Sequence, residues 1–310
     1  MEYRKSDLRG ILLTTSGAAC WGLSGSVGQY LFSVQKMDSH WLVPIRLGAA
    51  GIILFIYCLM KFKRDTFLPW KTKESALTML TYGILGVSCC QFLYFLTIQL
   101  SSAAIGTIMQ DLAPVFILII SCIAAARKPK IIELATITLA IIGVFFITTN
   151  GNLASMSVSP AAIIAGAVSG ICVAVYNLLA PKLNHVPVLV IQAWSFLLGG
   201  FAGLFIFQIW KYHYIPNAYG ILGIAFVVVV GNIMAFGLYI SGVQKIGPQK
   251  AILYSFAEPI TAAIISTLVL GTAFTGFEAL GFALIFIMLW LTTVDTRSPR
   301  RPIKAKVKQA

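Results

Sequence analysis

Three ionisable side chains interrupt long apolar stretches of this chain. They are Arg46, Asp111 and Glu258. Placing a charged side chain at the centre of a bilayer costs roughly 2.5–3.5 kcal/mol on insertion scales, so such residues mark binding sites, proton relays or ion pairs. The two carboxyl groups are the residue types that would bind a cationic or amine-bearing solute, or a proton.

A proline follows each carboxyl group, three residues after Asp111 and one residue after Glu258. Pro114 and Pro259 each remove a backbone hydrogen bond and are expected to kink their helix, which frees a carbonyl group for a partner or a substrate. Glu258 is the stronger candidate because no basic residue is available at its depth. A buried carboxyl group favours its neutral form, so Glu258 is expected to exchange a proton for a cationic group of the substrate.

Each ionisable residue also has a structural interpretation. Asp111 could form an ion pair with Arg46, and Glu258 could be a protonated contact between helices. Arg46, near the outer end of its stretch, could extend to the lipid headgroups, or it could bind a substrate carboxylate.

Polar and aromatic residues within the apolar stretches form a second group of candidates. They could line a substrate cavity, although hydrogen-bonded contacts between helices would also explain them. This group comprises Trp21, Gln91, Tyr94, Gln110, Tyr176, Asn177, Asn232, Tyr239, Tyr254 and Ser255.

The elements that must position these residues are about ten apolar stretches, each near the roughly 20 residues that a helix needs to cross a bilayer. They lie at approximately 10–32, 41–60, 76–98, 103–125, 131–149, 160–180, 187–209, 219–240, 249–270 and 276–294. Hydrophobic residues make up 58% of the chain and charged residues 11%, far from the balance of a soluble domain. The sequence therefore predicts an all-α integral membrane protein with ten transmembrane helices.

The basic residues alternate between loops. Of the 23 Lys and Arg residues, 20 lie in the N-terminal segment, in every second loop and in the C-terminal tail. Such a bias is the positive-inside pattern, which places both termini in the cytoplasm. The net charge of +13 is thus explained without nucleic acid. We expect a multi-pass protein of the plasma membrane, in a bacterium the inner membrane, as a monomer or homodimer.

An internal repeat organises the chain. A shift of 145 residues superimposes several residues of the first half on identical residues of the second, together with the hydropathy pattern. The matching pairs are Gly86 and Gly231, Tyr94 and Tyr239, Gln99 and Gln244, Pro114 and Pro259, and Glu133 and Glu278. Each copy holds five predicted spans, an odd number, so the second copy must cross the membrane upside down. Inverted repeats are typical of secondary transporters, with the substrate site near the midplane between the copies.

The repeat defines the expected domain organisation. The first copy occupies residues 1–149, and a polar extracytoplasmic linker follows at 150–159. The second copy occupies 160–295, and a basic cytoplasmic tail ends the chain at 296–310.

Short motifs resemble a known family. They are Ser101-Ser102-Ala103-Ala104, Leu112-Ala113-Pro114-Val115-Phe116, Gly143-Val144-Phe145-Phe146-Ile147, Val173-Ala174-Val175-Tyr176-Asn177 and Ala257-Glu258-Pro259. Together with the duplicated five-helix unit, they make the chain similar to the EamA-like family of the drug/metabolite transporter superfamily. The resemblance implies a ten-helix transporter fold. One departure is that family members often carry a Gly-Glu pair before the last helix, where this chain reads Gly271-Thr272-Ala273.

Together these features predict a secondary active transporter of small polar metabolites, amino acids or amines, working by alternating access. We expect an exporter, with a proton as the possible coupling ion. No phosphate-binding loop of the Gly-x-x-x-x-Gly-Lys-Ser/Thr type occurs, and the histidines have no metal-ligand spacing, so no cofactor is expected and the protein is not expected to be an enzyme. An integral membrane enzyme acting on lipid, or a channel-like permease, is the alternative.

Overall fold

Helices are the only regular secondary structure in the described part of this chain. The computed structural model describes residues 2–152, 158–247, 251 and 254–295, and no strand occurs in these ranges. The predicted all-α fold is therefore confirmed. The basic tail, residues 153–157 of the linker and the beginning of the ninth predicted span lie outside the described residues.

The helices follow the predicted apolar stretches, and several are joined end to end into longer rods. Their bounds are α1 Glu2–Ser33, α2 Ser39–Phe62, η1 Lys63–Trp70, α3 Lys73–Leu80, η2 Thr81–Ser88, α4 Cys89–Leu100, α5 Ala103–Gln110, α6 Ala113–Ala124, α7 Ile131–Thr149, α8 Pro160–Leu179, η3 Ala180–Leu183, α9 Val188–Ile206, η4 Ile209–Lys211, α10 Ala218–Phe226, η5 Val227–Met234, α11 Ala235–Ile246, α13 Ala257–Leu268 and α14 Gly276–Asp295.

Seven helices among the described residues are long and apolar enough to cross a membrane. They are Ser39–Trp70, Lys73–Leu100, Ala103–Ala124, Ile131–Thr149, Pro160–Leu183, Val188–Ile206 and Ala218–Ile246. α13 and α14 are apolar but shorter. α1 is long but carries buried polar side chains such as Thr14, Ser26 and Gln29, which suits a helix whose neighbours are other helices rather than lipid.

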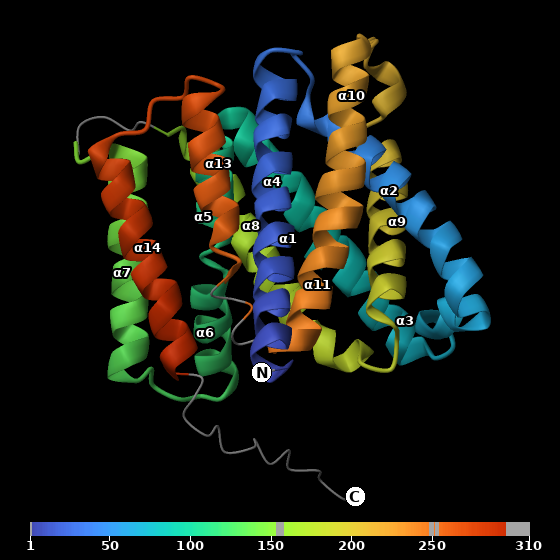
Figure 1. The fold of residues 1–310 in the computed structure, drawn as a ribbon, viewed down its shortest axis with the longest axis horizontal. Coiled ribbons are helices and arrows are strands. Elements are labelled where there is room, and N and C mark those ends of the chain that lie inside the picture. Colours follow the sequence, from blue (N-terminus) through green and yellow to red (C-terminus); the bar gives the residue numbers. More distant parts are fainter. Residues whose placement is uncertain (1, 153–157, 248–250, 252–253, 296–310) are drawn as a thin grey trace, which may run out of the picture.

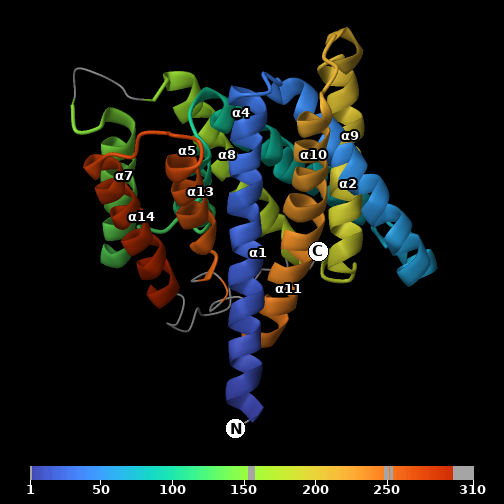
Figure 2. The same ribbon diagram turned by 45° about the horizontal axis from the view of Figure 1, so that its top comes forward.

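α1 lies in the centre of the bundle. It packs against α11 and α13, with α4, α5 and α10 also in contact. Paired helices form the two flanks, α7 beside α14 on one side and α2 beside α9 on the other (Figures 1 and 2). The central position of α1 means that groups near its middle are removed from the surrounding lipid.

Glycines allow the flanking pairs to approach closely. A Cβ atom on Gly200 of α9 would overlap the backbone of Gly48 on α2. In the other pair, a Cβ atom on Gly281 of α14 would overlap the carbonyl oxygen of Gly143 on α7. Small residues at helix contacts let backbones touch, which is the usual way in which helices associate where lipid supplies no hydrophobic driving force.

The loops and turns between the helices lie at two opposite ends of the bundle. The beginning of α1, the helix α3, the turn from α6 to α7 and the end of α14 lie at one end, at the bottom of Figure 1. The loop from α1 to α2 and the turn from α13 to α14 lie at the opposite end (Figure 1). The basic residues of Lys71–Lys73 and Arg127–Lys130 thus share one end of the molecule.

Two of the long membrane-spanning helices, Lys73–Leu100 and Ala218–Ile246, contain a π-helical segment in their middle. In the first, η2 joins α3 to α4, and in the second, η5 joins α10 to α11. The two segments correspond, within one residue, after the shift of 145. π-Helical turns inside α-helices are rare and occur frequently at functional sites. Both lie on rods that also carry candidate site residues, Tyr94 on the first and Asn232 and Tyr239 on the second.

Candidate functional site

The site begins at two interruptions of helical backbone. α5 ends at Gln110, and α6 begins at Ala113 after the two turn residues Asp111 and Leu112. The second interruption falls at Ser255 and Phe256, directly before α13. These positions correspond, within one residue, after the shift of 145. Broken helices at membrane depth are tolerated where other protein elements surround them, and they are typical of transporter binding sites.

The prolines have a different role from the one that the sequence predicted. Neither Pro114 nor Pro259 kinks a continuous helix. Each lies in the first turn of a new helix, at the second residue of α6 and the third residue of α13. The first backbone N–H groups of a helix have no intrahelical acceptor, so a proline there removes no hydrogen bond. The interruptions, not the prolines, expose the backbone groups.

The two carboxyl groups lie within electrostatic range of each other. Asp111 interacts electrostatically with Glu258, although one belongs to the first predicted copy and the other to the second. The elements on either side are in contact, since α5, which ends at the residue before Asp111, packs against α13, which carries Glu258. Asp111 Oδ2 is buried and has no hydrogen-bond partner among the described residues. A buried carboxylate oxygen without a donor is costly, so this atom requires a proton or a ligand.

Three tyrosine side chains lie within electrostatic range of the carboxyl pair. Tyr94 interacts electrostatically with both Asp111 and Glu258, and its buried hydroxyl group has no hydrogen-bond partner among the described residues. Tyr239 also interacts with both carboxyl groups, and Tyr176 interacts with Glu258. A hydroxyl group can donate to a carboxylate or accept from an ammonium group, so three tyrosines give a ligand several polar contacts.

The central helix closes one side of this cluster. A Cβ atom on Gly22 would overlap the carbonyl oxygen of Glu258, and one on Gly25 would overlap the hydroxyl group of Tyr94. Trp21, one residue earlier, has its ring centroid 5.0 Å from that of Tyr239. α1 therefore presents its glycines and Trp21 to the carboxyl pair, and any larger residue at Gly22 would displace α13.

Arg46 is buried inside the bundle, with 2% of its side chain exposed. Its guanidinium carbon lies 3.6 Å from the centre of the Phe95 ring, and Nη2 donates to Gln91 Oε1. Arg46 therefore does not extend to the lipid headgroups, which was one interpretation of the sequence. It also forms no ion pair with Asp111; the ion pairs among the described residues are Asp38–His40 and Arg127–Glu133.

The guanidinium group is incompletely satisfied. Arg46 Nε is buried and has no hydrogen-bond partner among the described residues, and no carboxylate of this part of the chain pairs with it. Asn232 contacts the same residue from η5, with Nδ2 donating to the Arg46 carbonyl oxygen at 3.5 Å. A cation that is buried against an amide and a ring retains unmet capacity for an anionic partner.

The remaining polar candidates from the sequence lie at different distances from the two helix interruptions. Gln110 accepts a hydrogen bond from Ser169 of α8 at 3.4 Å, near the first interruption. Asn177 is exposed and donates to the Val173 carbonyl oxygen of its own helix, so it lies apart from the carboxyl pair. Tyr254 and Ser255 are half-buried at the second interruption.

One buried residue was missed by the sequence reasoning. Gln29 on α1 accepts hydrogen bonds through Oε1 from the Ala103 backbone and from Ser266 Oγ, at 2.8 and 2.9 Å. Its Nε2 donates to Thr272 Oγ1 at 2.8 Å. One amide thus joins α1, α5, α13 and the segment before α14. A glutamine within an apolar stretch was the available signal.

This geometry defines a multi-pass α-helical membrane protein with buried polar groups between interrupted helices, the architecture of a membrane transporter. The chain belongs to the EamA-like transporter family, whose family model matches residues 8–149 and 160–294. The family is matched twice, on ranges close to the two predicted copies.

Curated relatives agree with this assignment. A Salmonella typhimurium protein named "Uncharacterized inner membrane transporter YicL" is 34% identical over 297 residues, covering 96% of this chain and 99% of that protein. "Uncharacterized transporter YetK" of Bacillus subtilis is 23% identical over 306 residues, covering 95% and 90%. "Uncharacterized inner membrane transporter YedA" of Escherichia coli K12 is 23% identical and covers 89% of both chains. With its membrane-spanning helices, this chain is a multi-pass protein of the bacterial inner membrane.

A solved structure supports the fold. The protein titled "Crystal structure of protein" is 17% identical and aligns with a TM-score of 0.63, covering 93% of this chain and 97% of that chain. At this identity the likeness concerns the fold alone.

Proposed function

We propose that this protein is a secondary active transporter of small polar metabolites that carry an amino group, with amino acids as the leading class. The observation that carries the proposal is the pair of carboxyl groups at the two helix interruptions, Asp111 and Glu258. They interact electrostatically, and Asp111 Oδ2 is buried without a donor. An ammonium group is a cation with several N–H donors, so it would satisfy both carboxyl groups at once.

Arg46 favours amino acids over simple amines. Both Arg46 and the carboxyl pair interact electrostatically with the hydroxyl group of Tyr94, so opposite charges flank one tyrosine. A zwitterion could direct its ammonium group toward Asp111 and Glu258 and its carboxylate toward Arg46. Arg46 Nε supports this orientation, because its N–H group has no hydrogen-bond acceptor among the described residues and could donate to the substrate carboxylate.

We propose that the transport cycle is alternating access between two inverted copies of five helices. The supporting features are the double family match, the helix interruptions and the π-helical segments, which recur at a spacing of about 145 residues. In this arrangement both termini face the cytoplasm, residues 150–159 are the extracytoplasmic linker, and the candidate site lies at the midplane between the copies.

Coupling to protons follows from competition for the carboxyl pair. Two nearby carboxylates repel each other, so the empty site favours binding at least one proton. An ammonium group and that proton would then bind alternately, which makes the process an exchange. With protons entering down their gradient, the exchange drives the substrate out of the cell, so we propose export.

The test is transport by the purified protein in proteoliposomes, with a panel of amino acids, amines and nucleosides over a pH series. We expect counterflow of amino acids and a loss of its pH dependence in Glu258→Gln, which keeps the shape and hydrogen bonding of the side chain. Glu278→Gln is the matched control, since the same chemical change falls outside the site, and it should transport as the wild type. Wild-type rates and pH dependence in Glu258→Gln would contradict the proposal.

A further inference from the structure

A cavity of about 290 Å³ lies between the two predicted copies, at the end of the bundle that holds the turn from α13 to α14. Ser102 of the first copy lines this cavity together with Ser266 and Thr272 of the second copy. The substrate path of a duplicated transporter lies between its copies. This cavity is therefore the candidate for the outer end of that path.

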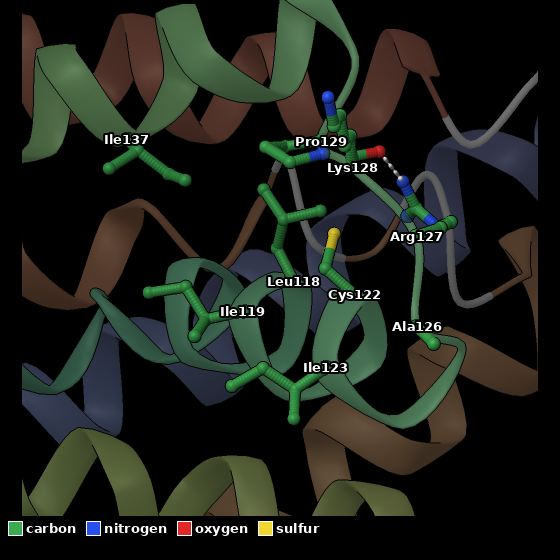
Figure 3. A pocket seen from close by; sticks show the side chains of 9 residues that line it. All are labelled: Leu118, Ile119, Cys122, Ile123, Ala126, Arg127, Lys128, Pro129 and Ile137. Atoms are coloured by element: carbon green, nitrogen blue, oxygen red, sulfur yellow. Dashed lines mark hydrogen bonds between the residues drawn. The ribbon is translucent and has the colours of Figure 1, made fainter.

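The larger cavity differs in position and in lining. Its volume is about 480 Å³, and its lining residues all belong to α6, α7 and the turn between them, within the first copy. Apolar side chains such as Leu118, Ile119 and Ile123 form most of it (Figure 3). Because no residue of the second copy is among its lining residues, this cavity is not part of an interface between the copies.

The Gln29 side chain lies at the inner boundary of the cavity between the copies. It is 7% exposed, and two of its partners, Ser266 and Thr272, also line the cavity. Oε1 accepts from the Ala103 backbone N–H at 2.8 Å and from Ser266 Oγ at 2.9 Å, and Nε2 donates to Thr272 Oγ1 at 2.8 Å. The bond to Ala103 stays within the first copy, whereas the other two join the first copy to the second.

The carboxyl site lies deeper in the bundle than this amide. On α13, Glu258, Ala262 and Ser266 are spaced by four residues and share one face of the helix. Ser266 is thus roughly 12 Å from Glu258 along the helix axis, at about 1.5 Å per residue. Ala262, which lies between them, is fully buried. On α1, the glycines that contact the site precede Gln29 by about one and two turns. Gln29 and its partners therefore form the layer between the cavity and the site.

We infer that this cavity is the extracytoplasmic vestibule of the transport path and that the Gln29 amide is the barrier between the vestibule and the carboxyl site. The inference rests on the transport function proposed above. The barrier opens when the copies move apart, which breaks the bonds to Ser266 and Thr272 and keeps the bond to Ala103. A typical hydrogen bond shifts an equilibrium roughly fivefold, so the loss of both bonds should favour the open state about 25-fold.

The experiment measures how fast a thiol behind the barrier reacts from outside the cell. Ala262→Cys is placed in the full-length protein in a cysteine-free background, and intact cells are treated with a small, charged, impermeant methanethiosulfonate. We expect slow reaction with the barrier intact and about 25-fold faster reaction after Ser266→Ala/Thr272→Val, which removes only the bonds between the copies. Gln29→Ala, which removes all three bonds, should accelerate the reaction at least as much.

Two controls separate the barrier from a general loosening of the structure. Thr267→Val makes the same kind of change in the lining of the same cavity, but Thr267 has no hydrogen bond to Gln29 among the described residues, so the reaction at Ala262→Cys should stay slow. Ala273→Cys replaces an exposed residue of the cavity lining and should react equally fast in every variant.

Three outcomes would overturn the barrier. They are an unchanged rate at Ala262→Cys in Ser266→Ala/Thr272→Val, an equal acceleration by Thr267→Val, and an equal acceleration at Ala273→Cys. Since the assay needs no substrate, each of these results would leave the transport site at Asp111 and Glu258 standing. A loss of the proposed function would appear instead in the proteoliposome assay of Glu258→Gln, so the two failures are distinguishable.

Discussion

The turns before α7 and before α14 share backbone features but differ in the charge of their side chains. Each contains a residue with positive φ, 46° at Ala126 and 65° at Gly271. In each, a glutamate in the first turn of the helix accepts a hydrogen bond from the backbone N–H three residues before it, Glu133 from Lys130 at 2.7 Å and Glu278 from Thr275 at 2.9 Å.

The difference lies in the side chains that this backbone carries. In the first turn Arg127 pairs with Glu133, whereas in the second Thr275 Oγ1 donates to Asn150 Oδ1 at 2.6 Å and no ion pair with Glu278 occurs among the described residues. Two turns can thus keep the same backbone hydrogen bonds while their side-chain charges differ. If the copies are inverted, the divergence has a physical cause, because basic residues are retained on the cytoplasmic side and lost on the other.

The largest expected effect concerns the carboxyl groups at the two interruptions. Asp111→Asn and Glu258→Gln should each reduce transport by roughly tenfold to hundredfold, since a hydrogen bond to a charged group contributes about 1.5–3 kcal/mol. If the two copies act as one site, the double variant should be little worse than either single variant. Transport rates in proteoliposomes measure this. Independent, multiplying losses would mean that the copies carry separate sites.

The second prediction tests whether the equivalent turns face opposite sides. In a cysteine-free background, Ala273→Cys should react with an impermeant maleimide on intact cells, whereas Lys128→Cys should react only after permeabilisation. Positions near Asn152 and Tyr214 should behave like Ala273, and positions near Lys63 and Lys182 like Lys128. Reaction of Lys128→Cys from outside would rule out the inverted arrangement.

The third prediction compares how much the capping residues Glu133 and Glu278 contribute to the free energy of unfolding. Glu133→Ala removes the cap of α7 and leaves Arg127 without its carboxylate, so we expect the free energy of unfolding to fall by about 2 kcal/mol. Glu278→Ala removes a cap alone and should cost about 1 kcal/mol. Thermal unfolding in detergent measures both variants. Equal losses would mean that the ion pair contributes nothing beyond the cap.

The smallest expected effect concerns the residue with positive φ. Ala126→Gly relieves a left-handed conformation that costs an alanine about 1 kcal/mol, so it should stabilise the protein by up to that amount. Gly271→Ala should destabilise it by a similar amount, because nothing within 4 Å obstructs the new side chain and only the backbone conformation resists it. The same unfolding assay checks the pair, and effects of equal sign would show that the turns differ more than their backbone angles indicate.

Part of the candidate site was predictable from residue type alone. Asp111 and Glu258 stand out because carboxyl groups are rare in apolar helices. The sequence could not reveal that the helices break beside them. Pro114 and Pro259 predicted kinks, but the helix is interrupted just before Ala113 and Ala257, and each proline lies in the first turn of the next helix. Where the interruption falls depends on how neighbouring helices pack.

The amino-acid sequence by itself determined the class of this protein: its apolar stretches, its charge pattern and its duplication depend only on residue type and spacing. Tertiary structure decided which polar groups share a site. Arg46 is buried against Phe95 and Gln91 instead of reaching the headgroups, Asn177 bonds within its own helix, and Gln29 joins four elements. The physical reason is that hydropathy gives the depth of a residue, whereas the direction in which its side chain points and the partner it finds depend on the rotation and contacts of every helix around it.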